Sequence, residues 1–124
     1  MMIKDEQVLL IRHTYQPGWF MPGGGVKRGE TLEQAARREA QEEVGAELGE
    51  LTLLGIYTHI GDFRTDHNIL FLCCDFTLDG THDSEIAETR FFALNDLPEN
   101  LALGHRRRLE EYRAGTPVLQ FGEW

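Results

Sequence analysis

Residues 24–46 have the sequence GGVKRGETLEQAARREAQEEVGA, in which a glycine-rich stretch runs into a helical pattern. Thr31 can cap the start of a helix, and Gln34, three residues later, can complete a capping box. Gly45 is suited to end the helix, because glycine adopts the left-handed backbone of a C-terminal cap without strain. The sequence therefore predicts a loop followed by a helix over about 32–44.

Three carboxylates share one face of this predicted helix. At about 100° per residue, Glu39, Glu42 and Glu43 fall within an arc of about 100°. Like charges at these spacings repel by a few tenths of a kcal/mol per pair, so folding alone does not favour them. Bound magnesium or manganese would remove the repulsion, since hard cations prefer oxygen ligands. For the helix taken alone, a solvated acidic face softened by Arg37 and Arg38 is the competing interpretation.

The glycine triplet Gly23-Gly24-Gly25 lies a few residues before this helix. A backbone without side chains can approach a ligand closely, and its free N–H and C=O groups could help to hold a metal or a phosphate. A turn is the ordinary explanation of a glycine triplet by itself. Its position just before the acidic helix favours a ligand site.

The rest of the chain alternates strand and helix patterns. Strands are predicted over 7–12, 51–60, 68–76 and 89–94, with polar connections over 61–67 and 77–84. A loop brackets 19–21, a turn contains Pro98, a second helix covers 101–113, and the tail 117–124 is expected to pack back through Val118, Leu119, Phe121 and Trp124. The 124 residues suffice for one domain, so the class is α/β or α+β in a single domain.

Composition excludes several functions. The formal net charge is −9, from 12 Lys and Arg against 21 Asp and Glu, which argues against sequence-independent binding to nucleic acid. No stretch approaches the roughly 18 apolar residues of a membrane span. Residues 4–6 are charged where a signal peptide needs an apolar run, so a cytoplasmic protein is expected. An acidic protein that acts on an anion needs local Arg or Lys, or a bound metal, to reverse the field at its site.

Cysteine and histidine give no sign of a zinc site. Cys73 and Cys74 are neighbours in an apolar run, and on a strand they would point to opposite faces, so we expect two buried thiols without a mutual disulfide. His59, His67 and His105 have no ligand-like spacing to each other or to cysteine.

The spacing of the glycine loop and the acidic helix is specific. It resembles the Nudix box, Gly-x5-Glu-x7-Arg-Glu-U-x-Glu-Glu-x-Gly-U with U aliphatic, and the seven fixed positions are present as Gly24, Glu30, Arg38, Glu39, Glu42, Glu43 and Gly45. The two U positions are alanine, a small member of the aliphatic class. A chance match along this chain is on the order of one in 10⁵. The resemblance to MutT-like Nudix hydrolases extends over about 8–98.

This resemblance implies a fold, a cofactor and a set of roles. The fold would be a mixed β-sheet sandwiched between α-helices, with a single Nudix domain over 1–124 and the box at 24–46. Mg²⁺ (or Mn²⁺) would be bound by Glu39, Glu42, Glu43 and the carbonyl of Gly23. Glu30 and Arg38 would orient these carboxylates from behind. Water activated by the metal would then attack one phosphorus of a diphosphate.

The general base differs among members of the family, so two candidates follow from the resemblance. One is Glu39 from the box, and the other is Glu85 from a later loop, with Glu88 behind it. We name Glu85, although an ordinary polar loop explains both later residues equally well.

Substrate contacts outside the box are less specific. Arg12 and Arg64 are candidates for phosphate, and Phe63 or Tyr15 could stack on a base. Surface or packing roles are the alternative for each of them. The basic run 106–108 is interpreted as a solvated helix face.

The implied function is hydrolysis of a nucleoside diphosphate linked to another group, such as a nucleotide sugar, ADP-ribose, a dinucleotide or a nucleoside triphosphate. A nucleotide-sensing domain without turnover is the alternative, although such domains usually have a damaged box. A prenyl diphosphate isomerase is a third possibility, against which the intact box and short length speak. The first strand is shorter than is usual in the family, so either the sheet is short at that edge, or the tail or a second copy in a homodimer fills it.

Overall fold

The computed structural model describes residues 1–117 and 120–124. Its helices are α1 (Leu32–Val44) and α2 (Leu103–Arg113). The strands in chain order are β1 (Ile3–Lys4), β2 (Gln7–His13), β3 (Ala46–Leu48), β4 (Thr52–Ile60), β5 (Thr65–Leu72), β6 (Phe76–Leu78), β7 (Ile86–Ala93) and β8 (Gln120–Glu123).

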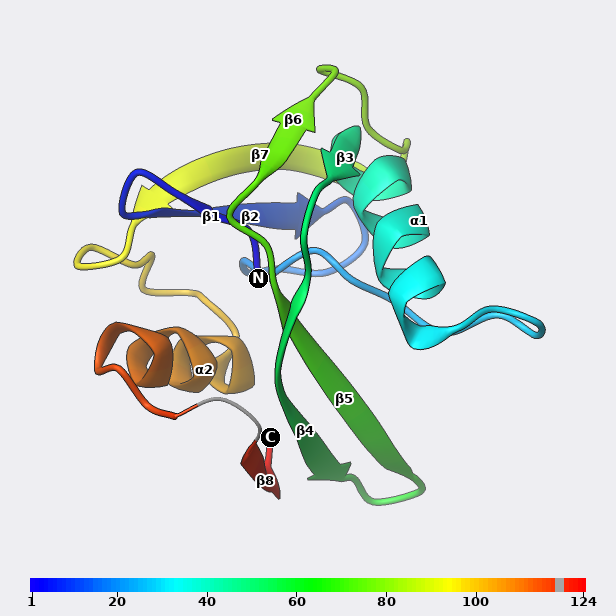
Figure 1. Cartoon of the computed structure of the whole chain (residues 1–124), viewed down its shortest axis with the longest axis vertical. Helices are drawn as coiled ribbons and strands as arrows, with labels where there is room; N and C mark the ends of the chain where they lie inside the picture. The colour runs from blue at the N-terminus through cyan, green and yellow to red at the C-terminus, as the bar shows by residue number, and fades with distance from the viewer. Residues whose placement is uncertain (118–119) are drawn as a thin grey trace.

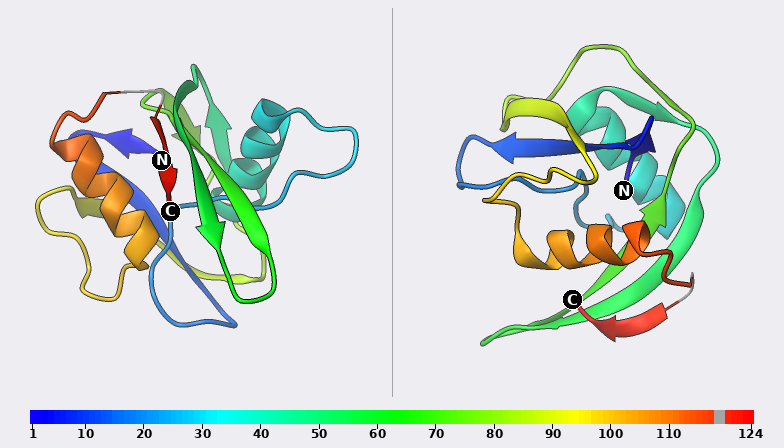
Figure 2. Two further views of the ribbon diagram at one scale, coloured as in Figure 1. Left: turned by 90° about the horizontal axis from the view of Figure 1, so that it is seen from below. Right: turned by 90° about the vertical axis from the view of Figure 1, so that its left-hand side faces the viewer.

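The strands form three small sheets between the two helices (Figure 1). The orders are β1-β2-β7, β3-β6 and β5-β4-β8, and β8 runs parallel to β4 while the other strand pairs are antiparallel. A bridge between Met2 and Cys73 joins the start of the chain to the end of β5. The views of Figures 1 and 2 place α1 and α2 on opposite sides of the strands. This confirms the expected single-domain α+β fold with mixed strands between helices.

The core has two halves, and β2 separates them. Val8 and Leu10 face one hydrophobic cluster, which contains Leu109 of α2. Leu9 and Ile11 face the other cluster, which contains the apolar side of α1. Because side chains alternate along a strand, four consecutive apolar residues can serve both halves. All four are at most 2% exposed, so β2 is a buried strand where the sequence predicts a strand over 7–12.

The helix α1 has the predicted ends. The Thr31 hydroxyl accepts the Gln34 N–H at 3.1 Å, and the Gln34 side chain accepts the Thr31 N–H at 2.8 Å. Gly45 ends the helix with φ 63°, in the left-handed region. A side chain there would also collide with Asp79, whose Oδ1 lies 1.9 Å from the position of an added Cβ. Local sequence therefore fixes both ends of the helix that carries the carboxylates.

Several strand boundaries differ from the prediction. β5 begins at Thr65, because the polar residues after the tip of the hairpin pair with β4, and it ends at Leu72. Phe76 opens a separate strand, β6, which pairs with β3. β3 was not predicted, because three residues are too few to show a period of two. β7 begins at Ile86, three residues earlier than the sequence indicates, where its pairing with His13 starts.

The C-terminal tail packs back only in part. Trp124 lies with its ring centroid 5.1 Å from that of His105, and β8 extends the sheet beyond β4. Phe121 is 81% exposed, so the prediction that it packs back is wrong; β8 is an edge strand with an open outer face. The predicted contacts of Val118 and Leu119 lie outside the described residues.

The paired thiols also differ from expectation. Cys73 is buried and Cys74 is exposed, and both are free. Successive side chains at the end of β5 point to opposite sides, so two neighbouring thiols can differ in burial. The expectation of two buried thiols is therefore wrong for Cys74, while the absence of a mutual disulfide agrees with it.

The start of the chain leaves part of β5 open. The Ile3 N–H donates to the Cys73 carbonyl at 3.0 Å, and the Cys73 N–H donates to the Met1 carbonyl at 2.9 Å. β5 lies at the end of its sheet order, so within the described residues no strand pairs with its outer edge over 65–69. The tail joins the opposite edge, on β4. In the described residues, the tail therefore does not fill this edge of β5. In the described residues, neither helix is long and apolar enough to cross a membrane.

Candidate active site

A cavity of about 520 Å³ lies beside α1, and part of the box lines it. Gly23, Gly24, Gly25 and Glu39 line one part of it. Residues 66–71 of β5 line another, together with side chains from α2 and the C-terminus. The glycine loop and Glu39 therefore face one cavity, whereas Glu42 and Glu43 are not among its lining residues in the described part of the chain.

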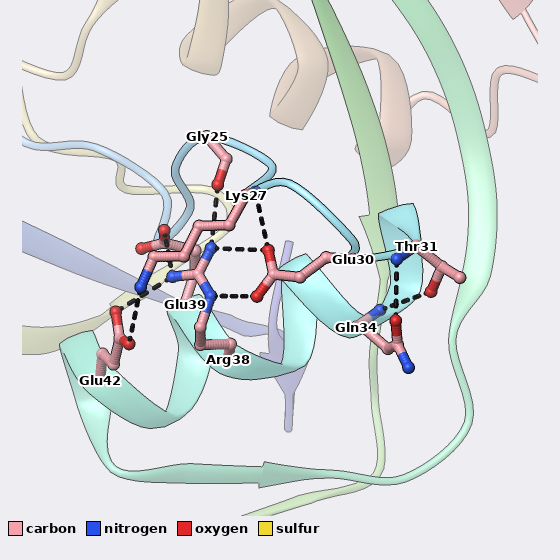
Figure 3. A network of polar contacts seen from close by, with 8 residues as sticks. All are labelled: Gly25, Lys27, Glu30, Thr31, Gln34, Arg38, Glu39 and Glu42. Carbon is pink, nitrogen blue, oxygen red and sulfur yellow. Dashed lines mark hydrogen bonds and ion pairs between the residues drawn. The ribbon is translucent and has the colours of Figure 1, made fainter.

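Arg38 lies at the centre of the box and binds three of its glutamates (Figure 3). It grips Glu30 with two nitrogens, Nε at 2.5 Å from Oε1 and Nη2 at 3.1 Å from Oε2. Its Nη1 donates to Glu39 at 2.7 Å and to Glu42 at 3.1 Å. Nη2 also donates to the carbonyl of Gly25 at 2.9 Å. A planar guanidinium offers several donors in a fixed fork, so one arginine orients both the helix carboxylates and the loop.

Glu30 is held as a carboxylate by these contacts. The hydrogen bonds from Arg38 and from the Lys27 N–H lower the pKa of Glu30 to about 2. Hydrogen bonding to Glu30 and Glu39 in turn raises the pKa of Arg38. The Lys27 ammonium lies 3.8 Å from Glu42 and adds positive charge on the same side of the helix. The expected orienting arrangement of Glu30 and Arg38 is thus built from charged groups.

Glu43 is more deeply buried than Glu39 and Glu42. Its residue is 8% exposed, and its Oε1 accepts the N–H of Gly23 at 2.6 Å. Burial first, and then the charges of Glu39, Asp83 and Glu42, raise the pKa of Glu43 to about 7, against the opposing effect of the Gly23 N–H. A buried carboxylate surrounded by other acids is costly to ionise. A divalent cation would relieve this cost, and carboxylate and carbonyl oxygens are the ligands that hard cations prefer. The donor set therefore fits a magnesium-like ion.

Gly24 is in close contact with Glu39. A Cβ added at Gly24 would lie 2.5 Å from the Glu39 carboxyl carbon, whereas one added at Gly23 or Gly25 would meet nothing within 4 Å. Only the middle glycine of the triplet is thus required by its surroundings. This explains physically why the box has glycine at this position.

The carboxylates are not gathered around one point. In residues 1–117 and 120–124, no group of three His, Cys, Asp or Glu side chains is arranged to hold a metal ion. Arg38 draws Glu39 and Glu42 toward itself, while Glu43 turns to Gly23.

The later acidic loop lies against the same end of α1. The Asp83 N–H donates to the carbonyl of Glu42 at 2.8 Å, and the Glu85 N–H donates to the Asp83 carboxylate at 3.3 Å. Burial first, and then the charges of Glu85 and Glu43, raise the pKa of Tyr15. Glu85 therefore belongs to the neighbourhood of the box. Asp83 was missed, and its only signal in the sequence is its place in the same polar connection.

Arg12 and Glu88 face each other on neighbouring strands. They are partners in the register of β2 and β7, and their side chains form an ion pair at 3.0 Å. Glu88 also pairs with Arg90, and hydrogen bonding to Arg12 lowers the pKa of Glu88. In the described part of the chain, neither Arg12 nor Glu88 lines the cavity. The structure thus gives each of them a partner away from the site.

Arg64 and the candidate stacking residues lie in different places. Arg64 lines the cavity, and its Nε lies 2.9 Å from Asp66. Phe63, beside it, is fully exposed. Tyr15 is 64% exposed and lies against His13, with ring centroids 4.8 Å apart. Of these residues, the structure brings only Arg64 to the wall of the cavity.

Four further residues of the cavity wall were not identified as site residues from the sequence: His13, Phe20, His105 and Trp124. His13 has a buried Nδ1 without a hydrogen-bond partner in the described residues, and burial lowers its pKa. These side chains come from four separate segments, so no spacing pattern could have grouped them.

Comparison with known proteins agrees with this geometry. The family model described as "NUDIX domain" matches residues 1–112. The ADP-ribose pyrophosphatase of Methanocaldococcus jannaschii is 35% identical over 114 residues, which cover 88% of this chain and 67% of that protein. A MutT NUDIX hydrolase from Burkholderia pseudomallei superposes with a TM-score of 0.78 at 31% identity, covering 88% of this chain and 90% of the other. The MutT protein of Bacillus halodurans has the same fold, with a TM-score of 0.82 at 17% identity over 98% and 86% of the two chains.

The box spacing, the Arg38-centred carboxylates and the α+β fold agree with the family match, which covers most of the chain. The chain therefore belongs to the Nudix hydrolase family of enzymes, which cleave diphosphate bonds.

Proposed function

We propose that this chain catalyses magnesium-dependent hydrolysis of the diphosphate bond in a nucleoside diphosphate linked to another moiety. The observation that carries the proposal is the state of Glu43, a buried carboxylate beside three other acids and against the glycine loop. A fold that needed only stability would not bury this charge. Nudix hydrolases generally use divalent metal ions. Such an ion, bound here, would offset the cost of ionising the buried carboxylate.

The residues that would hold the ion are Glu39, Glu42, Glu43 and the carbonyl of Gly23. All their donor atoms are oxygens, which suits Mg²⁺ and, second, Mn²⁺. The bound ion would supply charge neutralisation for the phosphate oxygens and a more acidic water. It would also resolve the problem of an acidic protein that acts on an anion.

The chain itself orients these groups. Arg38 holds Glu39 and Glu42 through one nitrogen and anchors to Glu30 through two others, so the carboxylates keep a fixed separation. The glycine loop leaves space for a diphosphate to approach its backbone. Arg64, on the cavity wall, is the residue we propose for a phosphate contact, whereas Arg12 does not line the cavity in the described part of the chain.

Glu85 is our candidate for the general base. Its exposed carboxylate shares the neighbourhood of Tyr15 with Glu43. Glu85 would take a proton from the attacking water while the new P–O bond forms. The bridging P–O bond would then break, and its oxygen would leave with the second phosphate. Glu39, which Arg38 binds directly, is the alternative base.

The proposal also covers the extent of the domain. The family match ends at residue 112, and β8 pairs with β4 beyond that point. We therefore include 1–124 in one Nudix domain with the box at 24–46. A homodimer through the open edge of β5 stays a prediction, which sedimentation velocity at several concentrations would test.

Phosphate release from a substrate panel tests the function. The panel contains ADP-ribose, a nucleotide sugar, a dinucleotide and a nucleoside triphosphate, each measured with magnesium or with chelator. A phosphatase added afterwards reveals monophosphate products. Turnover by the wild type that requires magnesium is expected, with loss in Glu42→Gln and retention in Glu50→Gln, which removes the same charge from an exposed loop. No turnover across the panel with intact nucleotide binding would instead indicate a sensor domain.

Glu85→Gln and Glu88→Gln separate the candidate bases. We expect Glu85→Gln to lower kcat by about 10²-fold or more, since general-base catalysis contributes at least this much. Glu88→Gln removes a carboxylate of the same size three residues away and should retain kcat. A kcat of Glu85→Gln equal to that of the wild type would exclude Glu85 and leave Glu39.

A further inference from the structure

The segment between Met21 and Gly23 is held at both ends by side chains from different helices. The Met21 N–H donates to Nδ1 of His105, on α2, at 3.0 Å. Two residues later, the Gly23 N–H donates to Glu43, on α1, at 2.6 Å. The first residue of the glycine loop is therefore placed by two contacts, and only one of them comes from the box.

The backbone just before this segment is also hydrogen-bonded to the residues at the start of α2. The Trp19 N–H donates to the carbonyl of Asn100 at 3.1 Å, and the Ala102 N–H donates to the carbonyl of Trp19 at 3.0 Å. Together with the contact of His105, these bonds tie 19–21 to the first turn of α2. The position of the loop that faces the box carboxylates thus depends on the position of α2.

His105 is suited to act as a fixed acceptor. Burial lowers the pKa of His105 to about 4, so its ring is neutral near pH 7. With Nδ1 accepting from Met21, the ring proton must be on Nε2. The ring lies edge-on between Phe20 and Trp124, at 5.6 and 5.1 Å between centroids and with interplanar angles of 89° and 85°. These packed aromatic neighbours hold the ring in place, so the acceptor keeps its direction.

We propose that His105 is a positioning residue: its Nδ1 fixes the Met21–Gly23 segment so that the backbone of Gly23 is presented to Glu43 and to the ion site. This inference rests on the proposed function, in which the carbonyl of Gly23 and the carboxylate of Glu43 serve the same ion. The box pattern does not contain His105, which lies 61 residues beyond Val44, the last residue of α1. The geometry assigns it a part in the site through one backbone hydrogen bond.

Three substitutions separate the two ring nitrogens. His105→Phe keeps a ring of similar size between Phe20 and Trp124 but removes both nitrogens. In His105→Asn, the side-chain oxygen is as many bonds from the backbone as Nδ1 and can accept the Met21 N–H. In His105→Gln, the amide lies one bond farther out, near the place of Nε2. His59→Phe is the matched control, since His59 is exposed on β4.

The first measurement is amide hydrogen exchange in the metal-free protein, which does not depend on activity. In His105→Phe, the Met21 and Gly23 amides should exchange about tenfold faster, since a lost hydrogen bond changes the opening equilibrium by about this factor. His105→Asn should restore slow exchange, and His105→Gln should not. Nitrogen-15 spectra of the wild type should show Nδ1 without a proton and Nε2 with one.

The second measurement is steady-state kinetics with magnesium. Loss of a residue that orients a metal site typically lowers activity by about 10- to 100-fold. We expect this loss in kcat for His105→Phe and His105→Gln, with little change in KM, and recovery in His105→Asn. Thermal unfolding of the variants shows whether a loss of kcat merely follows a loss of folded protein.

Several results would overturn the proposal. Unchanged Met21 and Gly23 exchange in His105→Phe would show that His105 does not position the segment. Normal kcat in His105→Gln together with low kcat in His105→Asn would assign the effect to Nε2, as a contact with substrate. If the wild type hydrolyses no diphosphate, the proposed function fails, while the exchange data still decide whether His105 holds the loop.

Discussion

Replacing Glu43 by glutamine removes a charge that the fold buries. Glu43 is 8% exposed, and burial raises its pKa from 4.5 to about 7. One pKa unit corresponds to about 1.4 kcal/mol, so ionised Glu43 costs the metal-free native state about 3 kcal/mol. Glutamine has no charge to desolvate, and its side-chain oxygen can still accept the Gly23 N–H.

The direction of the pH dependence follows from the raised pKa. Between pH 4.5 and about 7, folded Glu43 keeps a proton that the unfolded chain has lost. The native state then binds more protons than the unfolded state, so the free energy of unfolding falls as pH rises through this range. Below pH 4.5 both states are protonated and the cost disappears. Above about pH 8 the cost is complete.

Urea unfolding with chelator at several pH values between 4 and 8 measures this effect. We expect Glu43→Gln to be more stable than the wild type by about 3 kcal/mol at pH 8, with the difference vanishing near pH 4. Glu50→Gln, which removes an exposed charge, should differ from the wild type by less than about 0.5 kcal/mol throughout. Added magnesium should stabilise the wild type more than Glu43→Gln, because a ligand stabilises the state that binds it. A difference between Glu43→Gln and wild type that does not change with pH would refute the reasoning.

Substitutions at three other positions, each with a comparison variant, test the arrangement of the box and the core. Arg38→Gln should lower kcat by about 10- to 100-fold in steady-state assays, and Arg38→Lys should not restore it, because a single ammonium cannot reproduce the guanidinium fork. Gly24→Ala should lower kcat by about tenfold or more, because its Cβ would lie 2.5 Å from a box carboxyl group. Gly25→Ala, whose Cβ would meet nothing within 4 Å, should lower kcat less. Leu109→Ala, at a side chain that is 0% exposed, should lower the free energy of unfolding by about 2–5 kcal/mol, and Leu103→Ala, at 82% exposed, by less than about 0.5 kcal/mol in urea titrations. Equal effects within either matched pair would contradict the packing described above.

Local sequence was sufficient for the parts of the fold that depend on near neighbours. The ends of α1 follow from Thr31, Gln34 and Gly45, because caps are made between residues a few positions apart. β2 follows from a short apolar run between polar turns. The box follows from spacing alone, because one helix face brings residues three and four apart together.

The boundaries that were missed depend on partners far along the chain. β3 is a strand only because β6 pairs with it, and β5 reaches back to Thr65 only because β4 continues opposite. Cys74 is exposed and Cys73 is buried, because successive side chains there point to opposite sides. A period of two within a few residues cannot show which face or edge another segment will cover.

The sequence by itself determined the family, the helix that carries the carboxylates and the chemical type of the site, because these lie in one contiguous motif. Tertiary structure decided the state of the site. It buried Glu43 and so raised the pKa of that carboxyl. It also paired Arg12 with Glu88 and brought Arg64 to the cavity wall. Finally, it placed His105 where its ring accepts the Met21 N–H. Desolvation and long-range hydrogen bonds depend on which distant segments come into contact when the chain folds. A local sequence pattern does not contain this information.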